Sequence, residues 1–384
     1  MTERETTLER TAFVVLAACL GLVQFNLLAA ETLFGVAALM WLAIAVRDGG
    51  RPVVPSFFYA LAGYAGWTLV SAAFSLNPTE SFIDCKQLVL FLMVPMAARL
   101  CRGERAMTTL NVIIAFGAVG AIVGVIQATM FGYDNLSKRP DGSLSLYMTY
   151  SGIIMLVLCA TVARLLFYPQ QRIWPAVALP ALAIALALTL TRNAWLGAAA
   201  GIGILLGIQR KVLLVAVPLI GLLIVAVGPQ SLRDRALSSF TGNDPATRDR
   251  LAMLQMGPRI IADHPLTGVG PDQITHVYEQ YRPPTAVNKN NPHLHNVPLQ
   301  IAAERGIPAL LLWLLFIALA LRDLWRQTQQ GPARAVAAAG LAAITAMLVA
   351  GFFEHNFGDS EFLILFLGLI TLPFAARLTD ERTR

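Results

Sequence analysis

Charge is scarce in this sequence. Only 14% of its 384 residues are Asp, Glu, Lys or Arg, against roughly 25% in an ordinary soluble domain. Hydrophobic residues make up 56%, and the mean hydropathy is +0.62. This balance excludes a chain that is soluble throughout and predicts a polytopic membrane protein.

Cysteine is also scarce, and its placement argues against two kinds of site. The four cysteines lie within or beside apolar stretches, with neither the CxxC spacing of a metal site nor an evident pairing in a polar loop. They are Cys19, Cys85, Cys101 and Cys159. We therefore expect small buried core residues rather than disulfides or metal ligands.

Twelve apolar stretches are long enough for membrane spans, at about 20 apolar positions each. They lie near residues 11–29, 30–46, 54–74, 82–99, 107–131, 147–167, 173–190, 193–209, 211–228, 307–321, 334–353 and 360–377. The N-terminal MTERETTLER is too acidic for a secretory signal and no clear A-x-A cleavage site follows, so the first span is predicted to be uncleaved. The predicted fold is an all-α membrane protein of about twelve transmembrane helices.

The basic residues test this count, because Lys and Arg in short loops stay on the cytoplasmic side. With the N-terminus inside, the inner segments carry Arg4, Arg10, Arg47, Arg51, Arg99, Arg102, Arg105, Arg164, Arg172, Arg210, Lys211, Arg322, Arg326, Arg334, Arg377, Arg382 and Arg384. The short outer connections carry only Lys138, Arg139 and Arg192. We expect both termini in the cytoplasm. The net charge of +6 then reflects topology and anionic lipid headgroups, and nucleic acid is not an expected partner.

One polar segment, residues 228–306, is far longer than an ordinary connection and falls outside the membrane by the same alternation. We expect this large outer loop to contain short amphipathic helices. Asp244 is a possible helix cap, Leu251, Leu254 and Ile261 have helical spacing, and Pro258 should kink or end that helix. The predicted helix would lie on the membrane surface. RPPTAVNKNNP, which follows, is predicted to be irregular.

The loop leads back into the membrane through HLHNVPLQIAAERGIPALLLWLL. This pattern predicts a short helix around Leu299 to Glu304, a break at Gly306 to Pro308, and then a span. It places His295 and Asn296 at the mouth of the helix bundle.

An outer membrane face has no ATP, so a group transferred there must arrive activated, for example on a polyprenyl pyrophosphate. Transfer of a sugar to a hydroxyl needs a base for the hydroxyl proton and cations for the departing pyrophosphate. Histidine suits the first role and arginine the second. Arg192 lies between two apolar runs, Lys86 lies inside the fourth span, and Arg250 lies on the predicted surface helix. A charge at such a depth costs enough to need a reason.

Each candidate has a simpler interpretation. His295 could only hydrogen-bond its loop, and Arg192 could only extend its side chain to the interface. Lys86 could pair with Asp84 or Glu80.

His293 fits a structural role better, and His264 fits a turn with the Pro and Gly residues that follow it. Glu354 and His355, outside the eleventh span, could line an acceptor cleft.

At these residues the chain resembles the O-antigen ligase family, which joins O-polysaccharide to lipid A core in Gram-negative bacteria. That family and its relatives share a pattern of His, then Asn, Ser or Gln, nine residues, Gly, two residues, Gly. His295, Asn296 and Gly306 fit it, and Ala309 replaces the last glycine. Two further elements of the family also match, in the same order. They are Thr191 with Arg192, and Arg250 with Leu251 leading to the run from His264 to Gly270.

The resemblance implies a fold, substrates and roles. The donor would be undecaprenyl pyrophosphate-linked O-antigen and the acceptor a sugar hydroxyl of lipid A core, with transfer at the periplasmic face of the bacterial inner membrane. His295 would be the base, Asn296 would support it, and Arg192, Arg250 and Lys86 would bind the pyrophosphate. The reaction would need no metal and no cofactor and would invert the anomeric carbon.

Four regions follow: transmembrane helices in 1–190, a segment opening with the Thr-Arg element in 191–227, the periplasmic loop with catalytic residues in 228–306, and C-terminal transmembrane helices in 307–384. An O-antigen polymerase or a protein O-oligosaccharyltransferase has the same motifs and stays open as an alternative. A twelve-helix secondary transporter is the alternative from another class, although the sequence has no evident repeat and its long loop is placed asymmetrically. The sequence does not indicate an oligomeric state.

Overall fold

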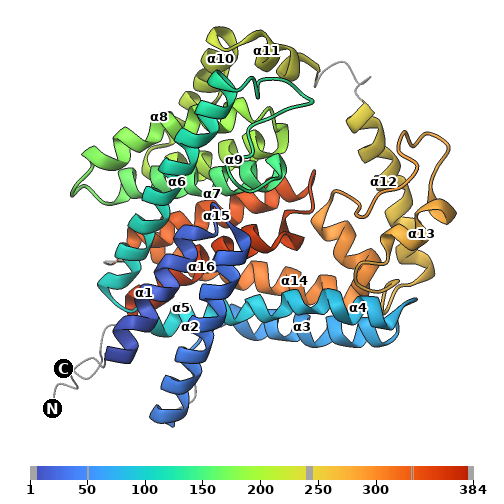
Figure 1. The fold of residues 1–384 in the computed structure, drawn as a ribbon, viewed down its shortest axis with the longest axis horizontal. Coiled ribbons are helices and arrows are strands. Elements are labelled where there is room, and N and C mark those ends of the chain that lie inside the picture. The colour runs from blue at the N-terminus through green and yellow to red at the C-terminus, as the bar shows by residue number, and fades with distance from the viewer. Residues whose placement is uncertain (1–6, 50–51, 239–244, 330, 332, 379–384) are drawn as a thin grey trace.

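A computed structural model describes residues 7–49, 52–238, 245–329, 331 and 333–378. Arg4, Arg51, Asp244, Arg382 and Arg384 lie outside these residues. Within them the regular elements are helical. In chain order they are α1 Thr7–Leu22, α2 Leu27–Asp48, α3 Phe57–Ala73, α4 Pro78–Asp84, the 3₁₀ segment η1 Cys85–Leu92, α5 Met93–Leu100, α6 Glu104–Met130, α7 Tyr147–Phe167, α8 Ile173–Leu188, α9 Arg192–Gln209, η2 Lys211–Val215, α10 Ala216–Val227, α11 Gln230–Leu237, α12 Pro245–Asp263, α13 Ile274–Tyr281, α14 Val297–Gln329, α15 Arg334–Gly351, η4 Asn356–Gly358 and α16 Ser360–Arg377 (Figure 1).

Eleven of the predicted spans lie largely on helical backbone, because a chain in lipid must satisfy its own peptide groups. The first predicted span, 11–29, is wrong in its bounds: α1 ends at Leu22, residues 23–26 form a turn, and α2 begins at Leu27. In the described residues, seven helices are long and apolar enough to cross a membrane: Leu27–Asp48, Pro78–Leu100, Glu104–Met130, Tyr147–Phe167, Val297–Gln329, Arg334–Gly351 and Ser360–Arg377. Phe57–Ala73, Ile173–Leu188 and Lys211–Leu223 are shorter apolar helices. The all-helical membrane class is confirmed, whereas the count of twelve stays a prediction.

The helix ends gather as the alternation of basic residues predicts. Arg99 at the end of α5 pairs with Glu9 near the start of α1 (2.6 Å) and with Asp48 at the end of α2 (2.8 Å). The Gly103 N–H donates to the Ala375 carbonyl near the end of α16 (3.2 Å). One end of the bundle therefore collects four of the segments predicted to be inside. In Figure 1, α12 and α13 lie at the opposite side of the molecule.

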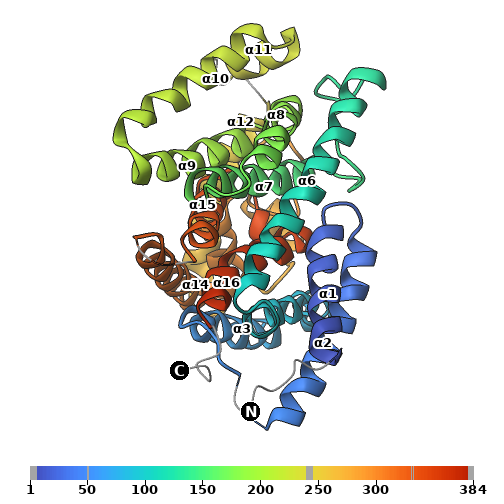
Figure 2. The same ribbon diagram turned by 90° about the vertical axis from the view of Figure 1, so that its left-hand side faces the viewer.

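Close helix packing depends on small residues, as is usual where lipid surrounds a bundle. A Cβ on Gly197 or Gly201 of α9 would lie 2.8 Å from the carbonyl oxygen of Ala346 or Ala342 on α15. These contacts also give the register, because the residue number increases along α9, from Gly197 to Gly201, while that of the facing residue on α15 decreases, from Ala346 to Ala342. The two helices are antiparallel, and α9 begins where α15 ends. At the edge of the bundle, residues 218–223 of α10 are exposed, and α11 follows α10 along the chain (Figure 2).

The long loop has a small core of its own. Met253, Met256 and Ile260 of α12 pack with Val277 and Tyr278 of α13. Residues 282–292 contain no regular element, as predicted. They are held by Asp249, whose carboxylate accepts the N–H groups of Val287 (2.7 Å) and Asn288 (3.0 Å).

Two details of α12 refine the prediction. Leu251 and Leu254 are about half exposed, whereas the buried face carries Ala252, Met253, Met256 and Ile260. The helix also continues through Pro258 to Asp263. The side that α13 and α14 cover therefore holds the methionines and not the leucines, and the position of this helix on the membrane surface stays a prediction.

The four cysteines are free and buried, which confirms their prediction as core residues. The predicted break in the tenth span is confirmed at Gly306, where φ is 80° and ψ is 170° inside α14. The fourth span is broken too, because η1 separates α4 from α5.

Candidate functional site

The turn after α15, from Phe352 to His355, is where the distant parts of the site meet. Phe352 O accepts from Asn296 Nδ2 (3.1 Å), and Phe353 O accepts from Arg250 Nε (3.0 Å). The Glu354 side chain is 11% exposed and contacts residues of two further segments. The loop, α12 and the end of α15 thus converge on four consecutive residues.

His295 lies against Glu354. Its Nδ1 is 2.9 Å from Glu354 Oε1, and its side chain is 17% exposed. The backbone of His295 has a φ of 49°, in the left-handed region that residues other than glycine seldom adopt. Such conformations persist where the surrounding contacts fix them, and they concentrate at functional sites.

Asn296 holds this conformation from the next position. Its Oδ1 accepts the N–H of Leu299 (2.9 Å), so it caps the start of α14, and its Nδ2 reaches Phe352 O. A helix cap of this kind stabilises by about 1 kcal/mol. Asn296 therefore caps α14, and the side chain of His295 contacts Glu354 instead of capping the helix.

Arg250 reaches the same carboxylate from α12. Its Nη2 lies 3.9 Å from Glu354 Oε2, and 27% of its side chain is exposed. Since a guanidinium has five N–H donors in a fixed fork, the exposed part remains suited to an anion. Arg250 and His295, which are 45 residues apart, are thus brought to one acidic side chain.

Arg192 is placed at the same end of the bundle by the register of α9 on α15. It is the first residue of α9, and α9 begins beside the end of α15, which leads into the turn with Glu354. The preceding carbonyl of Leu190 accepts from the buried Arg235 Nε (3.2 Å). Arg192 therefore stands at a helix N-terminus, whose N–H groups favour anions.

Lys86 lies on η1, exposed. Its predicted structural partners are engaged elsewhere among the described residues: Asp84 pairs with Arg305 (3.4 Å) and Glu80 with His276 (2.8 Å). Among the described residues, neither of these carboxylates forms an ion pair with Lys86. The neighbouring Gln87 donates to Gly358 O at 2.5 Å, which sets η1 beside the turn that follows His355.

His293 takes part in the same cluster. Its Nε2 is 3.3 Å from Glu354 Oε1, and its ring centroid is 4.3 Å from that of His295. The ligand atoms of His293, His295 and Glu354 lie within 4.8 Å of one another, so these three residues could hold a transition-metal ion. Arg250 lies beside the same carboxylate, and its positive charge disfavours the binding of a metal cation there.

The electrostatics of the turn favour an ionised Glu354 and a neutral His355. Burial alone would raise the pKa of Glu354, but hydrogen bonds from His293 and His295 hold that pKa well below its usual range. Burial, together with the charges of His293 and Arg305, holds the pKa of His355 well below its ordinary value. A cavity of about 20 Å³ lies between His355, Arg305 and Asp84.

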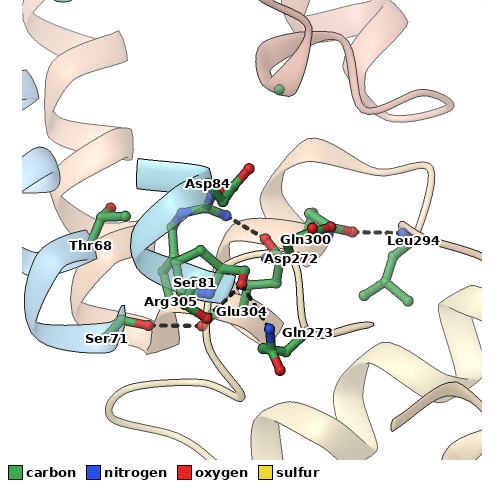
Figure 3. A network of polar contacts seen from close by, with 12 residues as sticks. Thr68, Ser71, Ser81, Asp84, Asp272, Gln273, Leu294, Gln300, Glu304 and Arg305 are labelled. Atoms are coloured by element: carbon green, nitrogen blue, oxygen red, sulfur yellow. Dashed lines mark hydrogen bonds and ion pairs between the residues drawn. The ribbon is translucent and has the colours of Figure 1, made fainter. Parts of the chain in front are cut away.

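A second network fixes the loop to the bundle (Figure 3). The N–H groups of Val269 and Gly270 donate to the carbonyls of Ala303 (3.0 Å) and Glu304 (2.9 Å). Ser71 Oγ donates to Thr267 O (2.6 Å), and Ser81 Oγ donates to Pro271 O (2.7 Å). These bonds run between the HPLTGVGP segment, α3, α4 and the start of α14.

Glycines allow this close contact. A Cβ on Gly268 would lie 2.2 Å from the Glu304 carbonyl carbon, and one on Gly306 would lie 1.9 Å from Leu266 O. Both have positive φ, 66° and 80°. The glycine of the His-Asn motif is therefore required where the loop crosses α14. Ala309 is fully buried in the core.

The sequence prediction missed the partner pair inside this network. Glu304 and Arg305 are 3% and 7% exposed, and Arg305 also reaches Asp84. The sequence contained one signal for this pair: Glu304 and Arg305 are adjacent, opposite charges next to an apolar run. A buried charge is tolerated only when it is paired. His264 accepts the Gly268 N–H with its carbonyl (3.1 Å), in the turn expected for it.

A model of the O-antigen ligase family matches residues 177–314, about a third of the chain. This match shows that residues 177–314 are similar to the O-antigen ligase superfamily. The matched segment runs from α8 into α14 and includes Arg192, Arg250 and His295, whereas Lys86 and Glu354 lie outside it.

A protein of Rickettsia bellii (strain RML369-C), named "Putative polysaccharide ligase", is 25% identical over 271 residues. The match covers 66% of this chain and 65% of that protein, so the chain spans less than two thirds of the length of that relative.

Proposed function

We propose that the protein is a glycosyltransferase of the O-antigen ligase type. It would transfer O-polysaccharide from undecaprenyl pyrophosphate to a sugar hydroxyl of lipid A core at the periplasmic face of the bacterial inner membrane. The observation that carries the proposal is the convergence of His295 and Arg250 on Glu354. His295 would supply the base and Arg250 a cation for phosphate, and the similarity of residues 177–314 to the O-antigen ligase family supports these roles.

The chemical step needs few groups. The acceptor oxygen attacks the anomeric carbon and forms the new glycosidic bond, while the imidazole of His295 takes the hydroxyl proton. The bond from the anomeric carbon to the diphosphate oxygen breaks, and its electron pair leaves on undecaprenyl diphosphate. Attack from the opposite face inverts the anomeric carbon. A positioned base of this kind contributes about 10²- to 10⁴-fold in rate.

The cations act on the leaving group. Arg250 presents the exposed part of its fork, and Arg192 adds a charge at the N-terminus of α9, where backbone N–H groups also favour phosphate. Lys86 on η1 is the third proposed contact to the pyrophosphate. These fixed charges stabilise the developing negative charge, and the proposed step uses neither a metal nor a cofactor.

The proposed membrane arrangement has twelve spans, both termini in the cytoplasm, and residues 228–306 in the periplasm. It is supported by the gathering of Glu9, Arg99 and Ala375 at one end of the bundle and by basic residues at predicted inner segments. Lipid donor and lipid acceptor would both approach from the outer leaflet. Nucleic acid has no place in this proposal.

The deciding experiment is transfer by purified protein in lipid nanodiscs with an undecaprenyl pyrophosphate-linked glycan. Three acceptors are compared: lipid A core, a second lipid-linked glycan, and an acceptor protein. Product on lipid A core supports the ligase; product on either other acceptor identifies a polymerase or a protein-glycosylating enzyme. His295→Ala should lower transfer at least about 100-fold, and the exposed His276→Ala is the matched control. Full transfer by His295→Ala would remove the proposed base.

A further inference from the structure

Glu354 is the group on which the candidate site converges, and glycosyl transfer as described above gives it no task. Its Oε1 lies within hydrogen-bonding distance of His295 Nδ1 (2.9 Å), His293 Nε2 (3.3 Å) and the backbone N–H of His355 (3.1 Å). Its Oε2 faces Arg250. We propose that Glu354 is a positioning residue that fixes the tautomer of His295 and leaves Nε2 as the catalytic base. This inference rests on the proposed function.

The tautomer follows from hydrogen-bond chemistry. An ionised carboxylate only accepts, so the contact of 2.9 Å requires a proton on Nδ1 of His295. A neutral imidazole with its proton on Nδ1 carries its lone pair on Nε2. The base is therefore the ring nitrogen on the far side from Glu354, and the acceptor hydroxyl must approach that edge.

The charge of Glu354 has a second effect. When Nε2 takes the hydroxyl proton, His295 becomes an imidazolium, and the adjacent carboxylate stabilises that positive charge. The depressed pKa of Glu354 keeps it ionised through the neutral range. A neutral amide at this position would preserve an acceptor oxygen and lose this stabilisation.

Glu354 is itself held in place, as a positioning group must be. It follows Gly351, the last residue of α15, whose added Cβ would lie 3.1 Å from Val297 on α14. The N–H of His355 fixes one carboxylate oxygen, and Asn296 fixes the carbonyl two residues earlier. The carboxylate and the imidazole are therefore both anchored to the start of α14.

Several charged or titratable groups surround this pair. Arg250 faces it from α12, His293 from the loop, and His355 from the same turn, with Arg305 of α14 acting on His355. His293 shares Oε1 with His295, so it orients the carboxylate but does not set the tautomer. Loss of His293 should consequently cost less activity than loss of the Glu354 charge.

The first test measures the tautomer without any turnover. Nitrogen-15 NMR of histidine-labelled protein in nanodiscs, assigned with His295→Gln, should show that the neutral ring of His295 carries its proton on Nδ1 and has an unprotonated Nε2. A neutral ring with its proton on Nε2 would overturn the proposal. This readout stays informative even if substituted proteins fold poorly or the substrates are different.

The second test uses Glu354→Gln, Glu354→Asp and, as a matched control, the exposed Glu279→Gln on α13. Glu354→Gln should lower kcat roughly 10²- to 10⁴-fold with a small change in KM, as expected for a lost orienting carboxylate. Because the imidazolium loses its counter-charge, the acidic limb of the kcat/KM profile should move to lower pH by about one unit. Glu354→Asp keeps the charge and should recover part of kcat.

The outcomes separate this inference from the proposed function. If wild type transfers glycan and His295→Ala does not, while Glu354→Gln matches wild type in kcat and pH profile, the role of Glu354 is refuted and the function stands. If wild type transfers nothing to any acceptor, the proposed function fails, and the NMR readout still decides the tautomer.

Discussion

Replacement of Gly306 by alanine tests whether backbone contact between loop and bundle organises the site. Gly306 has φ 80° and ψ 170°, a region that is essentially restricted to glycine. An added Cβ would lie 1.9 Å from Leu266 O and 2.3 Å from the Leu266 carbonyl carbon. Both obstacles are backbone atoms, so the loop itself must move.

The expected cost has two parts. The backbone strain contributes about 1 to 3 kcal/mol. Displacing the loop weakens three bonds: Ile307 N–H to Pro265 O (2.8 Å), Val269 N–H to Ala303 O and Gly270 N–H to Glu304 O. At about 0.5 to 1.5 kcal/mol each, together with the strain, the total destabilisation is roughly 2.5 to 7.5 kcal/mol.

Two glycines elsewhere provide matched controls. Gly49, at the end of α2, has φ 61° and open space around its added Cβ, so Gly49→Ala should cost only about 1 kcal/mol of backbone strain. Gly35 inside α2 has open space as well, and Gly35→Ala should be neutral or stabilising by about 0.5 to 1 kcal/mol.

Thermal unfolding and amide hydrogen exchange measure this series. Gly306→Ala should lower stability most and speed exchange across residues 265–273, and transfer activity should fall with it. If Gly306→Ala is no less stable than Gly49→Ala, the loop does not cross α14 as closely as described. The account of how the site is assembled would then be refuted.

Arg192→Lys keeps the charge and loses the bidentate fork, so donor kcat/KM should fall roughly 10- to 100-fold, the effect of losing about 1.5 to 3 kcal/mol of charged hydrogen bonding; near-normal kinetics would argue against a bidentate contact to pyrophosphate. Activity should survive a chelator, and loss that an added divalent ion reverses would contradict the metal-independent proposal. Added Zn²⁺ should inhibit transfer, because His293, His295 and Glu354 can bind it and His295 could then no longer accept the hydroxyl proton. His293→Asn should weaken that inhibition.

The helices were predictable because lipid leaves the backbone no alternative. Each apolar stretch of about 20 residues has to close its own hydrogen bonds, so hydropathy alone locates it. The break at Gly306 was predictable for a related reason: a Gly-x-Pro sequence at the start of an apolar run interrupts a helix and begins the next one. The membrane side of each end depends on Arg and Lys counts, and the ion pairs of Arg99 agree with the counts.

The face of α12 was not predictable by the same means. Leu251 and Leu254 have helical spacing, but Met253, Met256 and Ile260 are the residues covered by α13 and α14. Both sets have helical periodicity on one helix, so periodicity alone cannot choose between them. The choice depends on which side its neighbours cover, and those neighbours are brought there by Gly268 and Gly306, which leave no hydrophobic signal.

In the site too, contacts between neighbouring residues were predictable from the sequence, whereas contacts between distant residues were not. His295 and Asn296 are adjacent, and one caps α14 while the other reaches the carboxylate, so a local motif could record both. Glu354 is 59 residues further along the chain. The sequence placed it on the outer side with an imidazole next to it, but four loop histidines were possible partners for its charge. Only the register of α14 against the end of α15, set by Val297 against Gly351, selects His295 and His293 among them. A residue that acts through another is fixed by such packing, and therefore Glu354 could be named as a candidate from its sequence but given its role only from the fold.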